Sequence, residues 1–316
     1  MMLYPKVVFL LCLILVVTIP ALPQGCSDAG FCSMGAMKPD QPFNKKIEFK
    51  LRSMELSFYR GTTTLTPKVY VVTADFNFSL NSRNSVQIKV PYQITDGNFG
   101  GVSGVSDISL CYTRNVKSTQ NYDISVSVGA KIPSNDSNLK VEDRQLPMYY
   151  QTSLGTYDAI VGVSFITRNW LVATGIQHPF NENKNQFKYI DYDPPVYPDP
   201  DYVDDYDLAT NLKRGTDVML RVERNFRYSR VNFSVGLLPI YRITKDEIES
   251  PAGSGERIKV DKSTGLALSA IVTAGYGFNV RSGVKILVGK RIIHREVNPD
   301  GLTREMVTSL SYYYRF

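Results

Sequence analysis

Apolar and polar residues alternate with a period of two in twelve segments of this chain. Successive side chains of a β-strand point to opposite faces, so this alternation predicts strands rather than helices. In one segment, for example, Val284 and Ile286 oppose Lys285. The predicted strands span residues 46–60, 66–80, 84–94, 105–117, 120–132, 156–168, 169–181, 212–227, 229–245, 261–275, 277–294 and 301–316. Each strand therefore has one apolar face that needs an apolar neighbour.

The connections between these segments alternate in length. Tight turns are predicted at 81–84, 117–120, 168–169, 228–230 and 276–278, and longer joins at 61–65, 95–104, 133–155, 182–211, 246–260 and 295–300. Transmembrane barrels with an even strand number have short turns on one side and long loops on the other. The pattern predicts an all-β fold, an antiparallel up-and-down transmembrane barrel of about 12 strands over residues 46–316. A soluble sandwich or periplasmic barrel is the alternative, but it does not explain the loop lengths.

The N-terminus has the layout of a secretory signal peptide. Lys6 precedes the apolar run "VVFLLCLILVV", and "TIPALPQG" follows it. We therefore expect residues 1–24 to be a cleaved signal peptide, with an N-terminal membrane anchor as the alternative. Beyond residue 24 the sequence contains no run of about 20 apolar residues, the length that a spanning helix needs. The mature chain is thus expected to be either soluble or a membrane barrel.

The chain ends on "SLSYYYRF", a predicted strand with Leu310, Tyr312, Tyr314 and Phe316 on one face. This ending resembles the assembly signal of outer-membrane proteins, in which alternating hydrophobic residues close on a C-terminal Phe. The resemblance implies that Tyr312, Tyr314 and Phe316 are recognised by the outer-membrane assembly machinery. It also implies an outer-membrane location, in contact with lipid and lipopolysaccharide.

Two internal stretches resemble a known family. "KVPYQITDGNFGGVSGVSDISLCYTRNV" (89–116) and "LPMYYQTSLGTYDAIVGVSF" (146–165) are similar to signatures of the phenol-degradation-pathway transporter family of outer-membrane proteins. That family is similar in turn to the fatty-acid and aromatic-hydrocarbon channel superfamily, whose barrels carry a small N-terminal plug. The resemblance implies a passive outer-membrane channel for small, hydrophobic or aromatic molecules.

The segment after the signal peptide also carries a resemblance. "GCSDAGFCSMGAMKP" (25–39) looks like the segment that precedes such barrels in Bacteroidetes-type bacteria. It implies a plug or periplasmic segment at residues 25–45, with a disulfide between Cys26 and Cys32. A Cys32–Cys111 pairing and lipidation of Cys26 are the alternatives.

The alternation also places a nearly balanced set of charges on the inward face. The lumen-lining candidates are Lys89, Asp107, Asp123, Arg221, Glu223, Arg281, Lys285, Arg291 and Glu305. Such a set predicts interior ion pairs, which either pack a narrow barrel or line a path for solute. A twelve-stranded lumen is intermediate between side-chain-filled barrels and open porins, so a plugged one would pass small solutes at most.

Nothing in the sequence indicates catalysis or a cofactor. The only histidines are His178 and His294, and neither has the His-x-Ser arrangement of twelve-stranded outer-membrane phospholipases, which need a base beside their nucleophile. The net charge is +6 without a basic run, which argues against nucleic-acid binding. We therefore expect a channel rather than an enzyme. The alternative is an accessory barrel subunit of a larger outer-membrane complex.

The most unusual segment is "YIDYDPPVYPDPDYVDDYD" (189–207). Its prolines predict extended structure rather than helix. Weak metal candidates in it are Asp199, Asp201, Asp204, Asp205 and Asp207, because Ca²⁺ takes six to eight oxygen ligands. A solvated outer loop is the simpler interpretation. In an accessory barrel, residues 182–211 would be the docking surface for a protein partner.

Overall fold

The computed structural model describes residues 50–192, 200–251 and 255–316. The predicted signal peptide, the predicted plug at 25–45, Cys26, Cys32 and Asp199 all lie outside these described residues.

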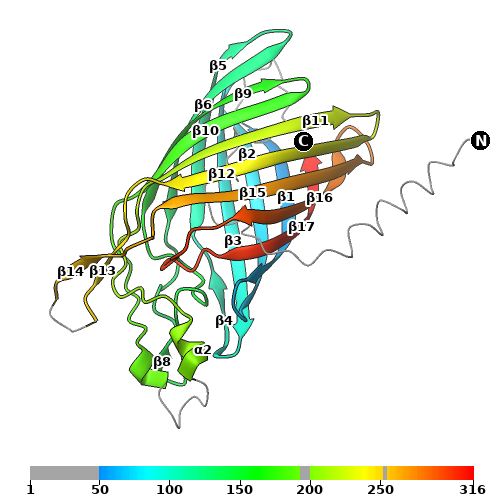
Figure 1. Ribbon diagram of the computed structural model, residues 1–316. Helices are drawn as coiled ribbons and strands as arrows, with labels where there is room; N and C mark the ends of the chain where they lie inside the picture. Colours follow the sequence, from blue (N-terminus) through cyan, green and yellow to red (C-terminus); the bar gives the residue numbers. More distant parts are fainter. Residues whose placement is uncertain (1–49, 193–199, 252–254) are drawn as a thin grey trace, which may run out of the picture.

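Twelve antiparallel strands form a closed barrel (Figure 1). Its strands are β1 (Lys50–Thr63), β2 (Lys68–Ser79), β3 (Asn84–Gly97), β5 (Ile108–Ser118), β6 (Tyr122–Ile132), β9 (Asp158–Thr167), β10 (Trp170–Pro179), β11 (Asp217–Arg227), β12 (Val231–Arg242), β15 (Gly265–Gly277), β16 (Ser282–Ile293) and β17 (Arg304–Arg315). Each pairs with its neighbours in chain order. The fold class predicted from the sequence is confirmed, and the predicted strands coincide with the observed ones to within a few residues.

The first and last strands close the sheet. β1 pairs with β17 from Ser53 opposite Arg315 to Thr63 opposite Arg304. The ladder reaches the last residue, because the Phe316 amide donates to the Arg52 carbonyl at 3.0 Å. None of the twelve described barrel strands is therefore left as an edge, which is the condition for placing a sheet in hydrocarbon.

A thirteenth strand, β4 (Gly100–Val105), corrects the prediction of a loop over 95–104. β3 continues to Gly97, and the chain turns back at Gly100, whose φ of 103° favours glycine. β4 and β5 both pair with β3, and the Ser106 amide donates to the Pro91 carbonyl between them at 2.8 Å. β4 thus extends the line of β5 along β3. Its sequence, "GGVSGV", is rich in glycine, so the alternation of apolar and polar residues cannot be recognised in it.

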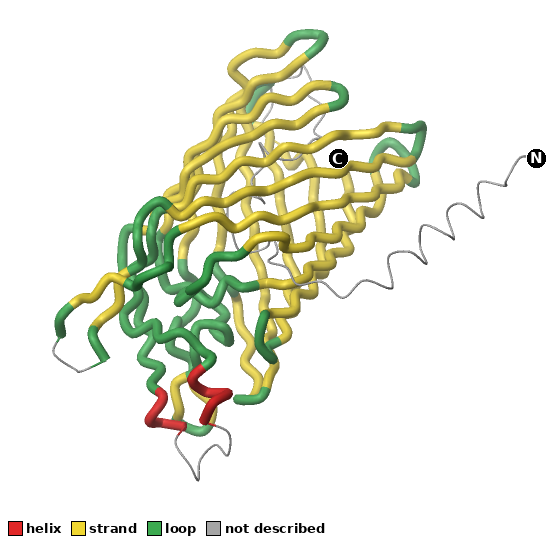
Figure 2. The backbone as a smooth tube through the Cα atoms, viewed as in Figure 1, coloured by secondary structure: helices red, strands yellow, loops and turns green. Residues whose placement is uncertain are grey.

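The two ends of the barrel differ. Turns of two to four residues join strands at one end, which we call the short-turn end, and the remaining connections gather at the other, the long-loop end (Figures 1 and 2). The long connections contain β7 (Lys140–Val141), β8 (Arg144–Gln145), η3 (Tyr189–Tyr192), α2 (Pro200–Asp204), β13 (Glu247–Glu249) and β14 (Arg257–Lys259). The short helix α2 corrects the expectation that the prolines exclude helix, because it begins at Pro200, where proline is tolerated.

No helix among the described residues is long and apolar enough to cross a membrane.

The two faces of the barrel wall have opposite character. Outward side chains such as Leu56 and Leu310 are 52% and 53% exposed, whereas inward Ser127 and Ser164 are each 1% exposed. Every strand contributes to this alternation, so the outside of the barrel presents apolar side chains and the inside is largely polar. A wall of this kind suits hydrocarbon outside and water or polar groups inside.

Neighbouring residues on β17 test this assignment of faces. Leu310 points outward, and Ser309 points inward at the same depth. We expect Leu310→Lys to destabilise the bilayer-inserted protein by about 2–4 kcal/mol, because it places a charge against lipid. The control, Ser309→Lys, should cost much less. Urea unfolding from lipid vesicles measures both, and equal costs would contradict the assignment.

Candidate functional site at the long-loop end

One loop segment crosses the mouth of the barrel at the long-loop end. We call residues 146–155 the crossing segment. At one side, the carbonyl of Gln151 accepts a hydrogen bond at 3.0 Å from the amide group of Gln93, a buried inward side chain of β3. Nearby, the Ser153 hydroxyl donates to Asp107, which also accepts the Leu154 amide at 3.2 Å. This end of the crossing segment is therefore held against the inner wall at β3 and β5.

The middle of the crossing segment, at Met148 and Tyr149, meets the loop between β16 and β17. Gly301 lies against the Tyr149 backbone so closely that an added Cβ would be 2.6 Å from the Tyr149 nitrogen. Its φ of 67° is also a conformation that favours glycine. The segment thus contacts both the β3 side and the β17 side of the mouth, whereas the β13–β14 hairpin projects away from the barrel (Figure 1).

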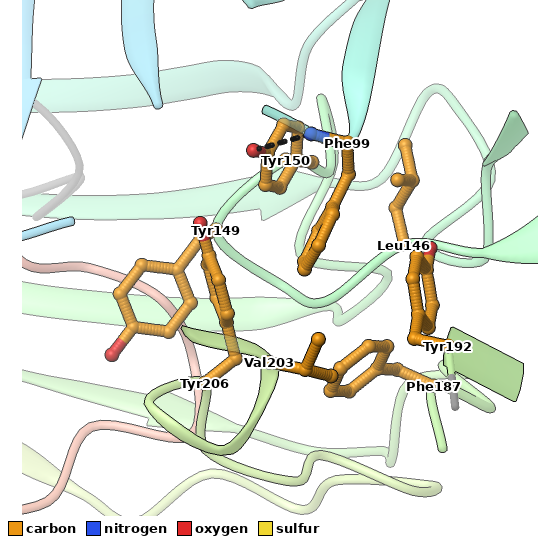
Figure 3. Close-up of a cluster of buried hydrophobic side chains, with 8 residues drawn as sticks. All are labelled: Phe99, Leu146, Tyr149, Tyr150, Phe187, Tyr192, Val203 and Tyr206. Carbon is orange, nitrogen blue, oxygen red and sulfur yellow. Dashed lines mark hydrogen bonds between the residues drawn. The ribbon is translucent and has the colours of Figure 1, made fainter. Parts of the chain in front are cut away.

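Part of the crossing segment belongs to a cluster of buried, mainly aromatic side chains, shown in Figure 3. This aromatic cluster consists of Phe99, Leu146, Tyr149, Tyr150, Phe187, Tyr192, Val203 and Tyr206. Phe99, at the tip of the β3–β4 hairpin, is its centre: its ring centroid lies 5.6 Å from that of Tyr150, 4.6 Å from Tyr192 and 5.1 Å from Tyr206. Aromatic pairs at such distances stabilise one another beyond their burial alone.

The acidic, proline-rich segment supplies part of this cluster. Tyr192, Val203 and Tyr206 are buried, whereas Asp201, Asp204 and Asp205 are exposed. The segment is therefore amphipathic, with its aromatic residues turned into the mouth and most of its described carboxylates turned to solvent. The interpretation as a simple solvated loop is wrong for the aromatic half.

The tyrosine hydroxyls join this packing to other loops. The Tyr202 and Tyr206 hydroxyls are 2.5 Å apart, and Thr66 from the β1–β2 connection contacts Tyr202. Burial, with a smaller contribution from Asp207, raises the pKa of Tyr189 to about 12, and burial raises the pKa of Tyr206 further. These tyrosines are therefore neutral at physiological pH and act as hydrogen-bonding aromatic groups.

A buried charge network lies beside the aromatic cluster. It consists of Arg214, Arg242, Arg295, Asp158, Asp217, Asp246 and Asp300, all of them buried. The guanidinium of Arg242, which is 1% exposed, is 2.8 Å from oxygens of Asp217, Asp246 and Asp300. One arginine at the end of β12 thus joins the start of β11, the β12–β15 connection and the β16–β17 loop.

The remaining arginines extend the network around the mouth. Arg214 lies 2.9 Å from Asp158 at the start of β9 and 3.4 Å from Asp300. Burial alone would raise the pKa of Asp300, but the guanidiniums of Arg242, Arg295 and Arg214 hold that pKa well below its usual range. A carboxyl group with a lowered pKa stabilises the fold above its unfolded pKa, and this contribution is lost as the pH falls. Acid therefore weakens the attachment of the loops.

Asp300 is the common partner of this network, so its removal gives a direct test. We expect Asp300→Asn to destabilise the long-loop end by about 3–5 kcal/mol, because it leaves buried guanidiniums short of a counter-charge. The measurement is protease cleavage of the loops in the membrane-inserted barrel at increasing denaturant concentrations. Asp261→Asn is the control: its partner Lys245 is solvent-exposed, and little change is expected. Equal protease resistance of Asp300→Asn and wild type would contradict this role.

Most of the charged residues predicted to face the lumen lie in ion pairs across the inner wall. Asp107 pairs with Lys131, Lys89 with Asp75, Arg221 with Glu223, Lys285 with Glu55 and Arg291 with Glu305. Asp123 accepts a hydrogen bond from Ser118 near the short-turn end. Arg281 is different: it lies exposed in the turn before β16, because that strand begins only at Ser282.

Apolar side chains also line part of the inner wall. Ile160, Leu171 and Met219 pack with Cys111 in one buried cluster. Tyr59, Val69 and Val307 form another, and Leu238 and Ile271 a third. The inner wall therefore combines ion pairs with apolar patches, which a uniformly polar pore would not show.

The other residues singled out in the sequence lie apart from one another. His178 is exposed and its Nδ1 lies 2.8 Å from the Thr216 hydroxyl, and His294 is exposed beyond β16. Among the described carboxylates of the acidic segment, Asp207 turns inward and accepts a hydrogen bond from the Asn298 amide at 2.9 Å. Among the described residues, no group of three or more His, Cys, Asp or Glu side chains is arranged to hold a metal ion.

Comparisons with known proteins agree with this architecture. No family model matches the chain, and no curated protein matches it. An outer-membrane channel from Pseudomonas putida F1 has a similar structure, with a TM-score of 0.58 and 11% identity over 88% of this chain and 100% of that one. The NanC porin has a TM-score of 0.48 and 8% identity over 84% of this chain and 100% of its own. At 11% identity, the likeness to the Pseudomonas channel shows the fold, a closed antiparallel barrel.

Proposed function

We propose that this protein is an outer-membrane channel for passive passage of small molecules. The observation that carries the proposal is the closed twelve-stranded barrel with an apolar outer face and a largely polar inner face. The similarly folded protein from Pseudomonas putida F1 is itself described as an outer-membrane channel. Outer-membrane barrels have their long loops outside the cell and their short turns in the periplasm. The long-loop end of the proposed channel would therefore face outward and its short-turn end the periplasm.

The mouth and the inner wall support a proposal for the solute class. A solute entering from outside meets the aromatic cluster first and then a wall on which apolar patches alternate with ion pairs. Small hydrophobic or aromatic molecules suit such a path, because rings stack on Phe99 and its tyrosine neighbours. The resemblance to phenol-degradation-pathway transporters supports the same class.

The accessory barrel is the second candidate. The observation in its favour is how well the described mouth is packed: Leu146, Tyr150 and Phe187 are entirely buried, and the charge network ties the loops together. In this function the exposed carboxylates of residues 182–211 would contact a partner protein. As part of either function, Tyr312, Tyr314 and Phe316 would serve as the assembly signal.

Single-channel recording in planar bilayers tests the channel. We expect a small conductance from wild type and a larger one from Phe99→Ala, because the substitution removes the ring that three buried tyrosines contact. Uptake of phenol into vesicles should rise in parallel. Phe180→Ala is the control, since Phe180 lies at the same end but is 66% exposed.

Absence of current and uptake in wild type, in Phe99→Ala and in a variant lacking residues 25–45 would contradict the channel. The accessory function would then be supported by a partner that co-purifies from native membranes and is lost when residues 201, 204 and 205 are changed to Asn.

A further inference from the structure

The short-turn end carries a basic residue in four of its five turns and, at the fifth, near the end of strand β5. We define the short-turn rim as residues 80–83, 117–121, 168–169, 228–230 and 278–281. Each of these five stretches has one basic residue and none has Asp or Glu: the cations are Arg83, Lys117, Arg168, Arg230 and Arg281. All five side chains are exposed. Because the turns are spaced around the barrel, the cations form a ring.

Two further arginines place this charge next to lipid. Arg114 lies on the outward face of β5, between the exposed side chains of Tyr112 and Val116. Arg224 lies on the outward face of β11, with its guanidinium carbon 5.0 Å from the centre of the Trp170 ring. Aromatic residues and cations share the headgroup region of membranes, where each finds both apolar and charged neighbours.

One carboxylate, Asp123, contacts the rim, where it accepts a hydrogen bond from Ser118. Asp123 follows the second turn, but its register partner is Ile166, which packs on the inner wall. The long connections have the opposite charge balance. Residues 133–157, 180–216, 243–264 and 294–303 together hold 18 acidic and 11 basic residues. The positive charge is therefore a property of the short-turn end alone.

We propose that the short-turn rim binds the phosphates of anionic phospholipids in the inner leaflet of the membrane. This rests on the proposed function, which places the short turns on the periplasmic side. Cations near a membrane surface attract anionic headgroups, and arginine forms bidentate contacts with phosphate. Lipid fits better than an acidic protein, because the cations surround the barrel and Arg114 and Arg224 point into the layer that lipid occupies.

The single tryptophan of the chain, Trp170, lies at this rim and reports on its lipid neighbours. The experiment measures quenching of Trp170 fluorescence in vesicles that contain brominated phosphatidylglycerol or brominated phosphatidylcholine at the same mole fraction. The expected relative binding constant favours phosphatidylglycerol about five-fold, the equivalent of one cation–phosphate contact. High salt should abolish the preference.

Matched variants locate the effect. Combining Arg114→Gln, Arg168→Gln and Arg230→Gln should remove the preference, while Arg224 stays to keep the Trp170 environment constant. The control combines Lys140→Gln, Lys184→Gln and Lys188→Gln, three exposed cations of the long-loop end, and should keep the preference. Equal quenching by both lipids in wild type, or a preference that survives the rim substitutions, would overturn the proposal. Channel current is measured with the same protein and lipids. A current without a lipid preference would contradict the lipid-binding proposal alone, whereas absence of current would count against the proposed function.

Discussion

Pairing of the first strand with the last is the constraint on which the rest of this structure depends. A sheet in hydrocarbon cannot leave edge amides and carbonyls without partners, so β1 and β17 must meet in register over their whole length. That register fixes which side chains face lipid, because a slip of one residue would turn every side chain to the other face. It also fixes the circumference of the barrel, and therefore the width of the mouth that the long loops must cross.

The loops at the mouth are stabilised by two kinds of interaction that depend on each other. The rings around Phe99 exclude water, and this makes the ion pairs of Arg242 and Asp300 electrostatically stronger. The ion pairs in turn attach the loops to strand ends, so that the rings stay together. Burying so many charges is costly, and the network is tolerated because Arg242 reaches three carboxylates at once. In the proposed channel, a solute that opens the mouth has to replace aromatic contacts without separating these charges.

The sequence predicted the barrel closely because alternation and turn length are local properties. β17 and most of the tight turns follow directly from them, whereas Arg281 was placed on the inner face because the strand predicted from residue 277 begins only at Ser282. The mouth could not be predicted in the same way. Phe99, Arg214, Arg242 and Asp300 lie at or beyond strand ends, where no period constrains the side chain, and their partners come from connections far apart in the sequence. The burial of Tyr192 and Tyr206 likewise depends on loops that no local pattern relates to them.

Hydrogen exchange of the membrane-inserted protein, followed by mass spectrometry, tests most directly whether the loops are held in the mouth. The amide of Gly215 donates to Asp246 at 2.6 Å and that of Leu302 to Asp300 at 3.2 Å, both within the charge network. Peptides containing these amides should exchange as slowly as the barrel strands. Peptides around the exposed residues 255–259 of the same long-loop end should exchange rapidly. Rapid exchange throughout 211–216 and 295–303 would contradict a mouth closed by inward-folded loops.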